Sequence, residues 1–165
     1  MPNWCEGTLK IRGSDHDILK FIKEGLNMYV YETSFNFIAK QVVASKSLWL
    51  KTGTDKFGNY INILDRRLYI EGTDRAFIRP KEELLIYNED IGNYICLNFE
   101  QAWDIRSADW VNLSKHWNLD FRLYGIERGG QFCREVEVID GKLTLDKTIK
   151  YDDWDWECPF PELGG

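Results

Sequence analysis

Residues 5–12 read CEGTLKIR, an alternation of apolar or small side chains with polar ones. A period of two sends successive side chains to opposite faces of a β-strand. We therefore expect a strand here, with one face in a core and the other in water. Gly13 follows as a turn residue, and Ser14 with Asp17 three positions later has the spacing of a helix N-cap.

Two helices are expected, one on each side of the strand-rich middle of the chain. The first ends between residues 25 and 27, and the second begins at Ser107, a good N-cap residue. At helical spacing, the apolar positions of the first helix are Ile18, Leu19, Phe21, Ile22 and Leu26. Those of the second helix are Trp110, Leu113 and Trp117. We expect Trp110 and Trp117 to be largely buried, together with Trp103 at the end of the preceding strand.

Short strands fill much of the remaining chain, and two turn motifs define the last hairpins. Gly129-Gly130 and Asp140-Gly141 are strong hairpin signals, because these residues accept the backbone angles of tight turns. Residues 28–47 fit either a strand or a packed loop. The expected strands are residues 47–52, 60–64, 68–71, 84–87, 93–99, 119–124, 131–138 and 143–149.

This order of elements predicts an α+β fold in which two helices cover one face of a mostly antiparallel sheet. The ferredoxin-like βαββαβ arrangement is the commonest solution of that kind, and a C-terminal hairpin would extend it. The chain has 165 residues, of which 44% are hydrophobic, which is enough for one core of ordinary size. We expect a single domain over residues 1–165, with an acidic, tryptophan-containing tail at residues 151–165.

The charge is distributed unevenly along the chain. Residues 1–82 carry 13 Lys and Arg against 10 Asp and Glu, whereas residues 83–165 carry 8 against 17, for a net charge of −6. Such a field repels phosphate backbones, so unaided nucleic-acid binding is disfavoured. No apolar run approaches the roughly 20 residues of a membrane span, and the first residues lack the pattern of a signal peptide. We expect a cytoplasmic protein without a membrane partner.

The sequence offers few groups for catalysis or metal binding. Its cysteines are far apart and form no C-x-x-C pair, and only His16 and His116 add imidazoles, each near a helix end. Motifs for nucleotide binding and for hydrolysis are absent. We therefore expect no enzymatic activity, no cofactor and no metal, and we expect reduced thiols of which two or three are buried. The cysteines are Cys5, Cys96, Cys133 and Cys158.

Three stretches of the chain resemble one family. They are the opening MPNWC with the strand and helix that follow it, the strand end NFEQAW at residues 98–103 before the second helix, and residues 124–132 before the last hairpin. These stretches are similar to the YubB-type ferredoxin-like proteins of phages and conjugative plasmids. Residues 28–93 match that family poorly, and Gln101 stands where the family has threonine.

The resemblance implies a ferredoxin-like fold, a mobile-element origin and action in the bacterial host cytoplasm. Two turns differ from the family pattern. Asp104-Ile105 replaces a proline-containing turn, and Cys133-Arg134 stands where a second glycine is usual. Because the family has no established reaction, the resemblance assigns no catalytic residue.

A ferredoxin-like sheet would also offer a face for RNA, where bases stack on aromatic rings and cations hold the phosphates. Strand parity places Trp49 and Arg12 near such a face. The main candidates for contacts with nucleic acid are Tyr69, Arg67, Arg122 and Tyr124. The chain lacks the aromatic RNA-binding signature of that class, and its acidic second half opposes the nucleic acid. An RNA- or single-stranded-DNA-binding module is therefore the alternative function, and an enzyme of unrecognised type is a further one.

The tail has the most unusual composition in the chain, with four carboxylates and two tryptophans in six residues: Asp152, Asp153, Trp154, Asp155, Trp156 and Glu157. In an extended conformation both tryptophans would share one face, which fits either packing on the domain or an interface. Tryptophan is a frequent interface anchor, and a row of carboxylates fits a basic groove made for phosphates.

The sequence therefore predicts a non-enzymatic accessory protein of a phage or other mobile element that binds a host protein with a basic surface through these six residues. The most concrete form is an inhibitor of a nucleic-acid-handling defence complex, such as a CRISPR effector.

Overall fold

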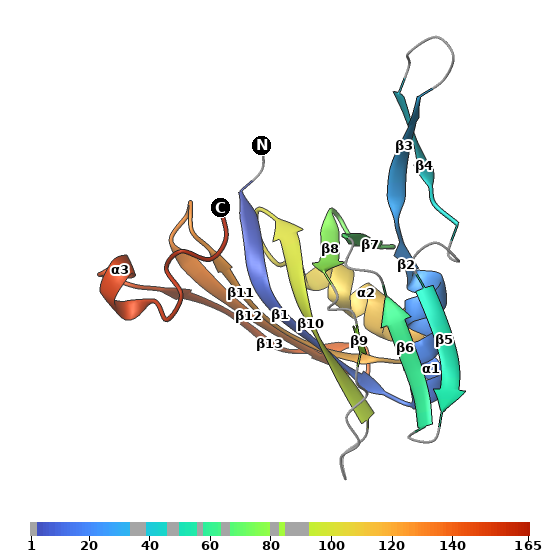
Figure 1. Cartoon of the computed structure of the whole chain (residues 1–165). Helices are drawn as coiled ribbons and strands as arrows, with labels where there is room; N and C mark the ends of the chain where they lie inside the picture. Colours follow the sequence, from blue (N-terminus) through green and yellow to red (C-terminus); the bar gives the residue numbers. More distant parts are fainter. Residues whose placement is uncertain are drawn as a thin grey trace.

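The protein has an α+β fold, shown in Figure 1 as a computed structural model that describes residues 3–33, 39–45, 50–55, 58–63, 67–79, 83–84 and 93–165. In chain order its elements are β1 (Trp4–Gly13), α1 (Asp15–Lys20), η1 (Phe21–Gly25, a π-helical turn), β2 (Leu26–Asn27), β3 (Tyr29–Thr33), β4 (Ala39–Val43), β5 (Leu50–Asp55), β6 (Gly58–Ile63), β7 (Leu68–Ile70), β8 (Ala76–Arg79), β9 (Glu83–Leu84), β10 (Asn93–Ala102), α2 (Ser107–Trp117), β11 (Asp120–Glu127), β12 (Phe132–Ile139), β13 (Lys142–Lys150) and α3 (Trp154–Glu157).

An antiparallel sheet dominates this fold. Within the described residues it has eight strands in the order β13-β12-β11-β1-β10-β8-β7-β2. The central strand β1 pairs over its whole length with β10 and over most of its length with β11. The hairpin of β3 and β4 projects away from this sheet in Figure 1, and β5, β6 and β9 form a small sheet of their own. The expected α+β fold with a mostly antiparallel sheet is confirmed.

The main core lies between the sheet and the helical segments α1, η1 and α2. Alternation along β1 turns Leu9 and Ile11 into this core, as the sequence pattern predicts. The helical segments add the apolar side chains of Ile18, Phe21, Ile22, Trp110 and Leu113. The predicted N-cap of the first helix is confirmed, because Ser14 Oγ accepts a hydrogen bond of 3.1 Å from the backbone N–H of Asp17.

A second, smaller core lies on the other face of the sheet. Ile126 and Cys133 are directly opposite each other in β11 and β12, and alternation turns them away from the main core. Trp154 and Cys158 pack against them, so the chain after β13 folds back over the sheet. We call residues 151–165 the C-terminal segment. We call the sheet face away from α1 and α2 the open face; its side chains include Lys10, Arg12, Phe77, Tyr94, Glu100, Arg122, Tyr124 and Glu137.

Both predicted C-terminal hairpins are present. Asp140 and Gly141 have φ angles of 50° and 68°, the positive values that a two-residue hairpin turn needs. The backbone N–H of Gly141 donates to Ser114 Oγ at 2.9 Å, which ties this turn to α2. In the preceding turn, the Glu127 carboxylate accepts hydrogen bonds from the N–H groups of Gly129 and Gly130. The second hairpin ends in β13, an edge strand whose side chains are mostly exposed.

Two of the three tryptophan predictions need correction. Trp110 is fully buried, as expected, but Trp117 is only partly buried at the last residue of α2. Trp103 is 51% exposed, so the prediction that it is buried was wrong. The reason is local: β10 ends at Ala102, and Trp103 adopts a φ of 73°, which takes its side chain out of the alternation of the strand. At α2, Arg106 occupies the N-cap position and Ser107 is the first helical residue.

The expected strand boundaries are only partly reproduced. Strand β8 was not predicted, and β7 pairs with β8 and β2 and not with β6 as a simple meander would require. Residues 28–47, which the sequence left open, include the β3–β4 hairpin. Trp49 and residues 85–87 of the expected strand at residues 84–87 lie outside the described residues. In the part of the chain that is described, no helix has the length and apolar character to cross a membrane.

Candidate functional site

The C-terminal segment is a compact turn of helix, and the extended conformation considered for it is wrong. Asp153 caps α3, and its carboxylate accepts a hydrogen bond from the N–H of Trp156 at 3.4 Å. Glu157 closes the turn from the other end, because its Oε2 accepts from the N–H of Asp152 at 3.1 Å. These two carboxylates are therefore engaged in holding the shape of the segment. The side chains of Asp152 and Asp155 are exposed.

Trp154 anchors the segment to the sheet. It is only 6% exposed, and its ring makes an edge contact with Tyr151 at a centroid distance of 5.9 Å. Its indole Nε1 donates to the carbonyl oxygen of Pro161 at 3.2 Å, so the polar atom of the buried ring has a partner. Further along, the backbone N–H of Gly165 donates to the carbonyl oxygen of Trp4 at 3.0 Å. The segment is thus fastened at its beginning and at its end.

Trp156 lies only two residues from this anchor, yet it is 86% exposed. The helical turn produces this difference, because residues two apart in a helix point in different directions. Phe160, also in the segment, is 63% exposed. The segment therefore presents two aromatic rings to solvent and also carries the exposed carboxylates of Asp152 and Asp155. We call these four residues the acidic–aromatic patch.

Packing of the C-terminal segment against the sheet alters the chemistry of groups within the segment. Burial is the main cause that raises the pKa of Cys158 and of Tyr151 above their usual values. On the main-core side of the sheet, burial likewise raises the pKa of Cys5 far above that of an exposed thiol. Three of the four cysteines are buried and all four are free thiols, as the sequence predicts. Because a raised pKa keeps a thiol protonated and a protonated thiol is a poor nucleophile, Cys5 and Cys158 act as packing residues.

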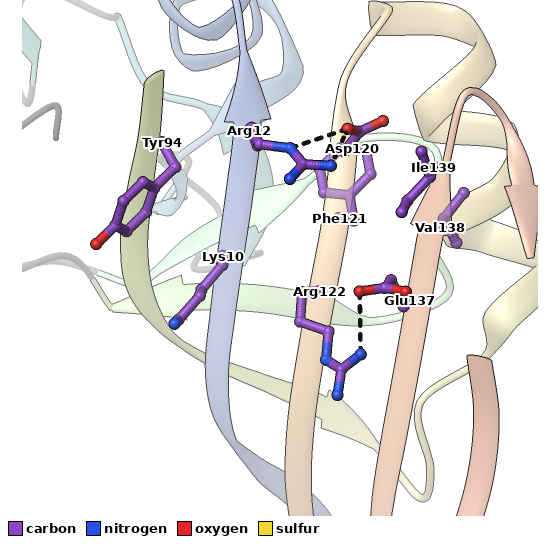
Figure 2. A pocket seen from close by; sticks show the side chains of 9 residues that line it. All are labelled: Lys10, Arg12, Tyr94, Asp120, Phe121, Arg122, Glu137, Val138 and Ile139. Carbon is purple, nitrogen blue, oxygen red and sulfur yellow. Dashed lines mark hydrogen bonds and ion pairs between the residues drawn. The ribbon is translucent and has the colours of Figure 1, made fainter. Parts of the chain in front are cut away.

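Lys10, Arg12 and Arg122 line a cavity of about 250 Å³ at one end of the open face (Figure 2). Arg12 donates to Asp120 Oδ2 through Nε at 3.1 Å and through a terminal nitrogen at 2.7 Å. Arg122 donates to Glu137 Oε1 at 3.0 Å. We call this cavity the sheet pocket; its lining is completed by Tyr94, Phe121, Val138 and Ile139.

Aromatic rings and arginines gather at the opposite end of the open face. The ring of Phe77 makes edge contacts with Trp4 at 5.8 Å and with Tyr69 at 5.4 Å between centroids. The Arg67 guanidinium lies over Trp4 at 4.3 Å and over Phe77 at 3.8 Å. It also pairs with the buried carboxylate of Glu100, although Glu100 Oε1 accepts no hydrogen bond of regular geometry. The rings and the cation are thus already packed on one another.

The four residues predicted for a nucleic-acid face lie in two separate places. Tyr69 and Arg67 belong to the aromatic group just described, where Trp4 and Phe77 join them. Arg122 and Tyr124 lie on β11, and three strands separate β11 from the β7 strand of Tyr69. Tyr124 is packed under the C-terminal segment. A continuous face through all four is therefore interrupted.

The histidines do not contribute to either region. His16 is exposed and contacts Asp17 at 3.2 Å, and the ring of His116 stacks edge-on against Trp117 at 4.6 Å. No group of three or more potential metal ligands occurs among the residues with described positions. Sequence reasoning identified the acidic–tryptophan stretch of the tail. It missed Trp4 and Phe77, whose proximity depends on β8 pairing with β10, and it missed the sheet pocket, to which four strands contribute.

Comparisons of the chain with protein-family models, with curated proteins and with solved structures found no match.

Proposed function

We propose that the protein is a non-enzymatic accessory factor that binds a host protein through the acidic–aromatic patch. The observation that carries this proposal is the contrast within α3, where Trp154 is buried as an anchor and Trp156 is 86% exposed. Removing a large apolar ring from water lowers the free energy, so a partner that covers Trp156 is bound more tightly. Because the anchor holds the ring in place, binding costs less conformational entropy than it would for a free tail.

Aromatic and acidic side chains serve different purposes in such an interface. A tryptophan at the centre of an interface commonly contributes roughly 2 kcal/mol or more, which corresponds to about 30-fold in Kd. Exposed carboxylates such as Asp152 and Asp155 contribute less to affinity, but they increase the association rate with a basic surface. The patch therefore fits a partner with an apolar pocket surrounded by positive charge.

The partner that we propose is a nucleic-acid-handling defence complex of a bacterial host, such as a CRISPR effector. Such a complex has a basic channel for phosphates, and residues 83–165 of this chain carry 17 acidic against 8 basic residues. The resemblance of residues 1–13, 98–103 and 124–132 to YubB-type proteins supports an origin in a phage or plasmid and action in the bacterial cytoplasm.

We propose further that the centre of the molecule is a ferredoxin-like unit. The support is the strand order β11-β1-β10-β8, in which every neighbouring pair is antiparallel. In the chain, α1 and η1 follow β1, and α2 lies between β10 and β11. Strands β2, β7, β12 and β13 would then extend this unit on both sides.

The test is capture of partners from bacterial lysate with the parent protein and three variants, followed by binding kinetics at two salt concentrations. Trp156→Ala is expected to increase the dissociation rate. The double variant Asp152→Asn, Asp155→Asn is expected to slow association and to weaken its dependence on salt. Asp153 and Glu157 are left intact, because their carboxylates hold the shape of α3.

Trp103→Ala is the matched control, since Trp103 is also an exposed ring but lies outside the patch. It should bind like the parent protein. If Trp156→Ala and the double amide variant also capture the same partner with unchanged kinetics, the acidic–aromatic patch is not the binding site and the proposal fails.

A second candidate function is RNA or single-stranded DNA binding by the open face. It is favoured by one observation, the packing of Trp4, Tyr69 and Arg67 around Phe77 of β8. Its test is a fluorescence titration with single-stranded RNA at low salt, where phosphate attraction is greatest. Affinity that falls with Tyr69→Ala and decreases with added salt would support this function; no binding at low salt would exclude it.

A further inference from the structure

Two cations of the sheet pocket are directly opposed on neighbouring strands. Lys10 and Arg122 are directly opposite each other on the antiparallel strands β1 and β11, and both side chains are on the open face. Directly opposed side chains have Cβ atoms roughly 4.5–5.5 Å apart, and like charges at such positions destabilise a sheet. In Figure 2 the two side chains start from adjacent strands and diverge, Lys10 toward the strand of Tyr94 and Arg122 toward that of Glu137.

Among the described residues, Lys10 is the one cation of the pocket lining without an ion pair. Arg12 is held by Asp120, and Arg122 by Glu137 at 3.0 Å and more distantly by Glu135 at 3.7 Å. The nearest described partner of Lys10 Nζ is the ring of Tyr94, whose centroid is 5.8 Å away. Within the described part of the chain, no carboxylate lies within ion-pair distance of Lys10.

We propose that the sheet pocket binds a small phosphomonoester, with its phosphate between Lys10 and Arg122. A phosphate monoester carries a charge of roughly −1.5 to −2 at neutral pH and three strong acceptor oxygens. It can therefore neutralise Lys10 and accept a second hydrogen bond from Arg122 without displacing Glu137. A carboxylate has two acceptor oxygens where a phosphate monoester has three, so it offers fewer acceptors to Lys10 and Arg122 together.

The size and the remaining lining of the pocket define the rest of the ligand. The cavity of about 250 Å³ is slightly smaller than the ~300–1,000 Å³ of typical pockets for drug-sized ligands, so the ligand has about the size of a pentose phosphate. Asp120 and Glu137 supply carboxylate oxygens that can accept hydroxyl hydrogens of a sugar. Tyr94 and Ile139 provide apolar surface for its carbon skeleton.

This site is separate from the acidic–aromatic patch. Along β11, the side chain two residues beyond Arg122 is Tyr124, which is already packed under the C-terminal segment. The pocket therefore lies beside the segment and not beneath it. The inference concerns a second activity of the chain and does not depend on the proposed protein partner.

The test is isothermal titration of the whole chain at low salt and slightly alkaline pH with ribose 5-phosphate, ribose and inorganic phosphate. Ribose 5-phosphate is expected to bind, and ribose is expected not to bind because it lacks the anion. Inorganic phosphate should bind more weakly, because it leaves the apolar lining uncovered. Lys10→Gln should weaken the binding of ribose 5-phosphate about tenfold, since it removes a charge-assisted hydrogen bond.

Lys23→Gln is the control, because Lys23 is an exposed lysine in η1 on the helical side of the sheet. It should bind ribose 5-phosphate like the parent protein. Without ligand, Lys10→Gln should melt at the same temperature as the parent or higher, since it relieves the repulsion with Arg122. This measurement separates a lost ligand contact from a damaged fold.

Four outcomes would each overturn the proposal. The first is equal affinity of parent and Lys10→Gln for ribose 5-phosphate. The second is binding of ribose as tight as that of ribose 5-phosphate, and the third is binding of inorganic phosphate as tight. The fourth is tighter binding of a single-stranded RNA than of ribose 5-phosphate, which would assign the pocket to the nucleic-acid face.

Discussion

At the scale of single residues, Trp110 is the largest fully buried side chain among the described residues. It is fully buried, its ring lies 6.2 Å from Phe99 and 5.4 Å from Phe121 between centroids, and its Nε1 donates to Gln101 Oε1 at 3.2 Å. Trp110→Ala would leave a large cavity and remove one of the two hydrogen bonds that Gln101 Oε1 accepts. We expect it to lower the free energy of unfolding by roughly 3–5 kcal/mol, measured by chemical denaturation.

Trp103 provides the comparison for that measurement. Because it is half exposed and adopts a positive φ outside the strand, Trp103→Ala should cost about 1 kcal/mol or less. Equal decreases in the free energy of unfolding for the two variants would contradict the assignment of Trp110 to the core and Trp103 to the surface. The sequence predicts burial for both rings, Trp103 at a strand end and Trp110 on the inner face of a helix. The prediction for Trp103 is wrong because a sequence pattern does not show where a strand ends and its backbone turns.

Glu6, a side chain of the open face, makes the stability of the fold depend on pH. It is opposite Glu100 on β1 and β10, and burial, followed by the charge of Glu100, raises the pKa of Glu6 above its usual 4.5. The folded protein therefore retains this proton to a higher pH than the unfolded chain. As the pH rises above 4.5 and then past the raised pKa, ionisation of Glu6 progressively lowers the free energy of unfolding.

Glu6→Gln is accordingly expected to raise the melting temperature at neutral pH and to flatten the decline in stability above pH 4.5. Glu24→Gln, at an exposed position of η1, should leave the profile unchanged. Thermal unfolding at a series of pH values gives both results. A Glu6→Gln profile parallel to that of the parent would show that Glu6 does not titrate as this geometry requires.

At the scale of elements, α3 depends on the sheet for its structure. Four residues are too few for an isolated helix, so its order comes from Trp154 and from the carboxylates of Asp153 and Glu157. Trp154→Ala should release the C-terminal segment and accelerate amide hydrogen exchange there by about 100-fold, while β1 and β11 stay protected. Trp156→Ala should leave exchange unchanged, because that ring is exposed.

If both variants exchanged at the rate of the parent, Trp154 would not be the anchor. The composition of the tail is visible in the sequence. The sequence does not show that one of its tryptophans is buried and the other exposed. Both rings follow acidic residues and lie two apart, so the parity of an extended chain put them on the same face. The capping bonds of Asp153 and Glu157 select a helical turn instead, and in a helix the same spacing separates the rings.

At the scale of the whole molecule, local patterns predicted β1, α1, α2 and the last two hairpins, because each has a strict period or a specific turn residue. The middle of the chain has neither. Strand β8 is four residues long, and β2 and β9 are two residues long, so pairing with distant strands decides their place. The sheet pocket and the aromatic group around Arg67 depend on that long-range pairing, which explains why single-sequence reasoning did not assemble them.

The position of β13 at the end of the sheet also bears on self-association. Of the described strands only β12 pairs with β13, so backbone groups along its outer side are open to another chain. Lys142, Lys147 and Lys150 are all exposed on this strand, and lysines on a bare edge discourage a second molecule from docking there. Replacing all three with valine should make sedimentation velocity concentration-dependent, as molecules add edge to edge into larger aggregates. The lysines of β13 thus keep an open-ended sheet from growing.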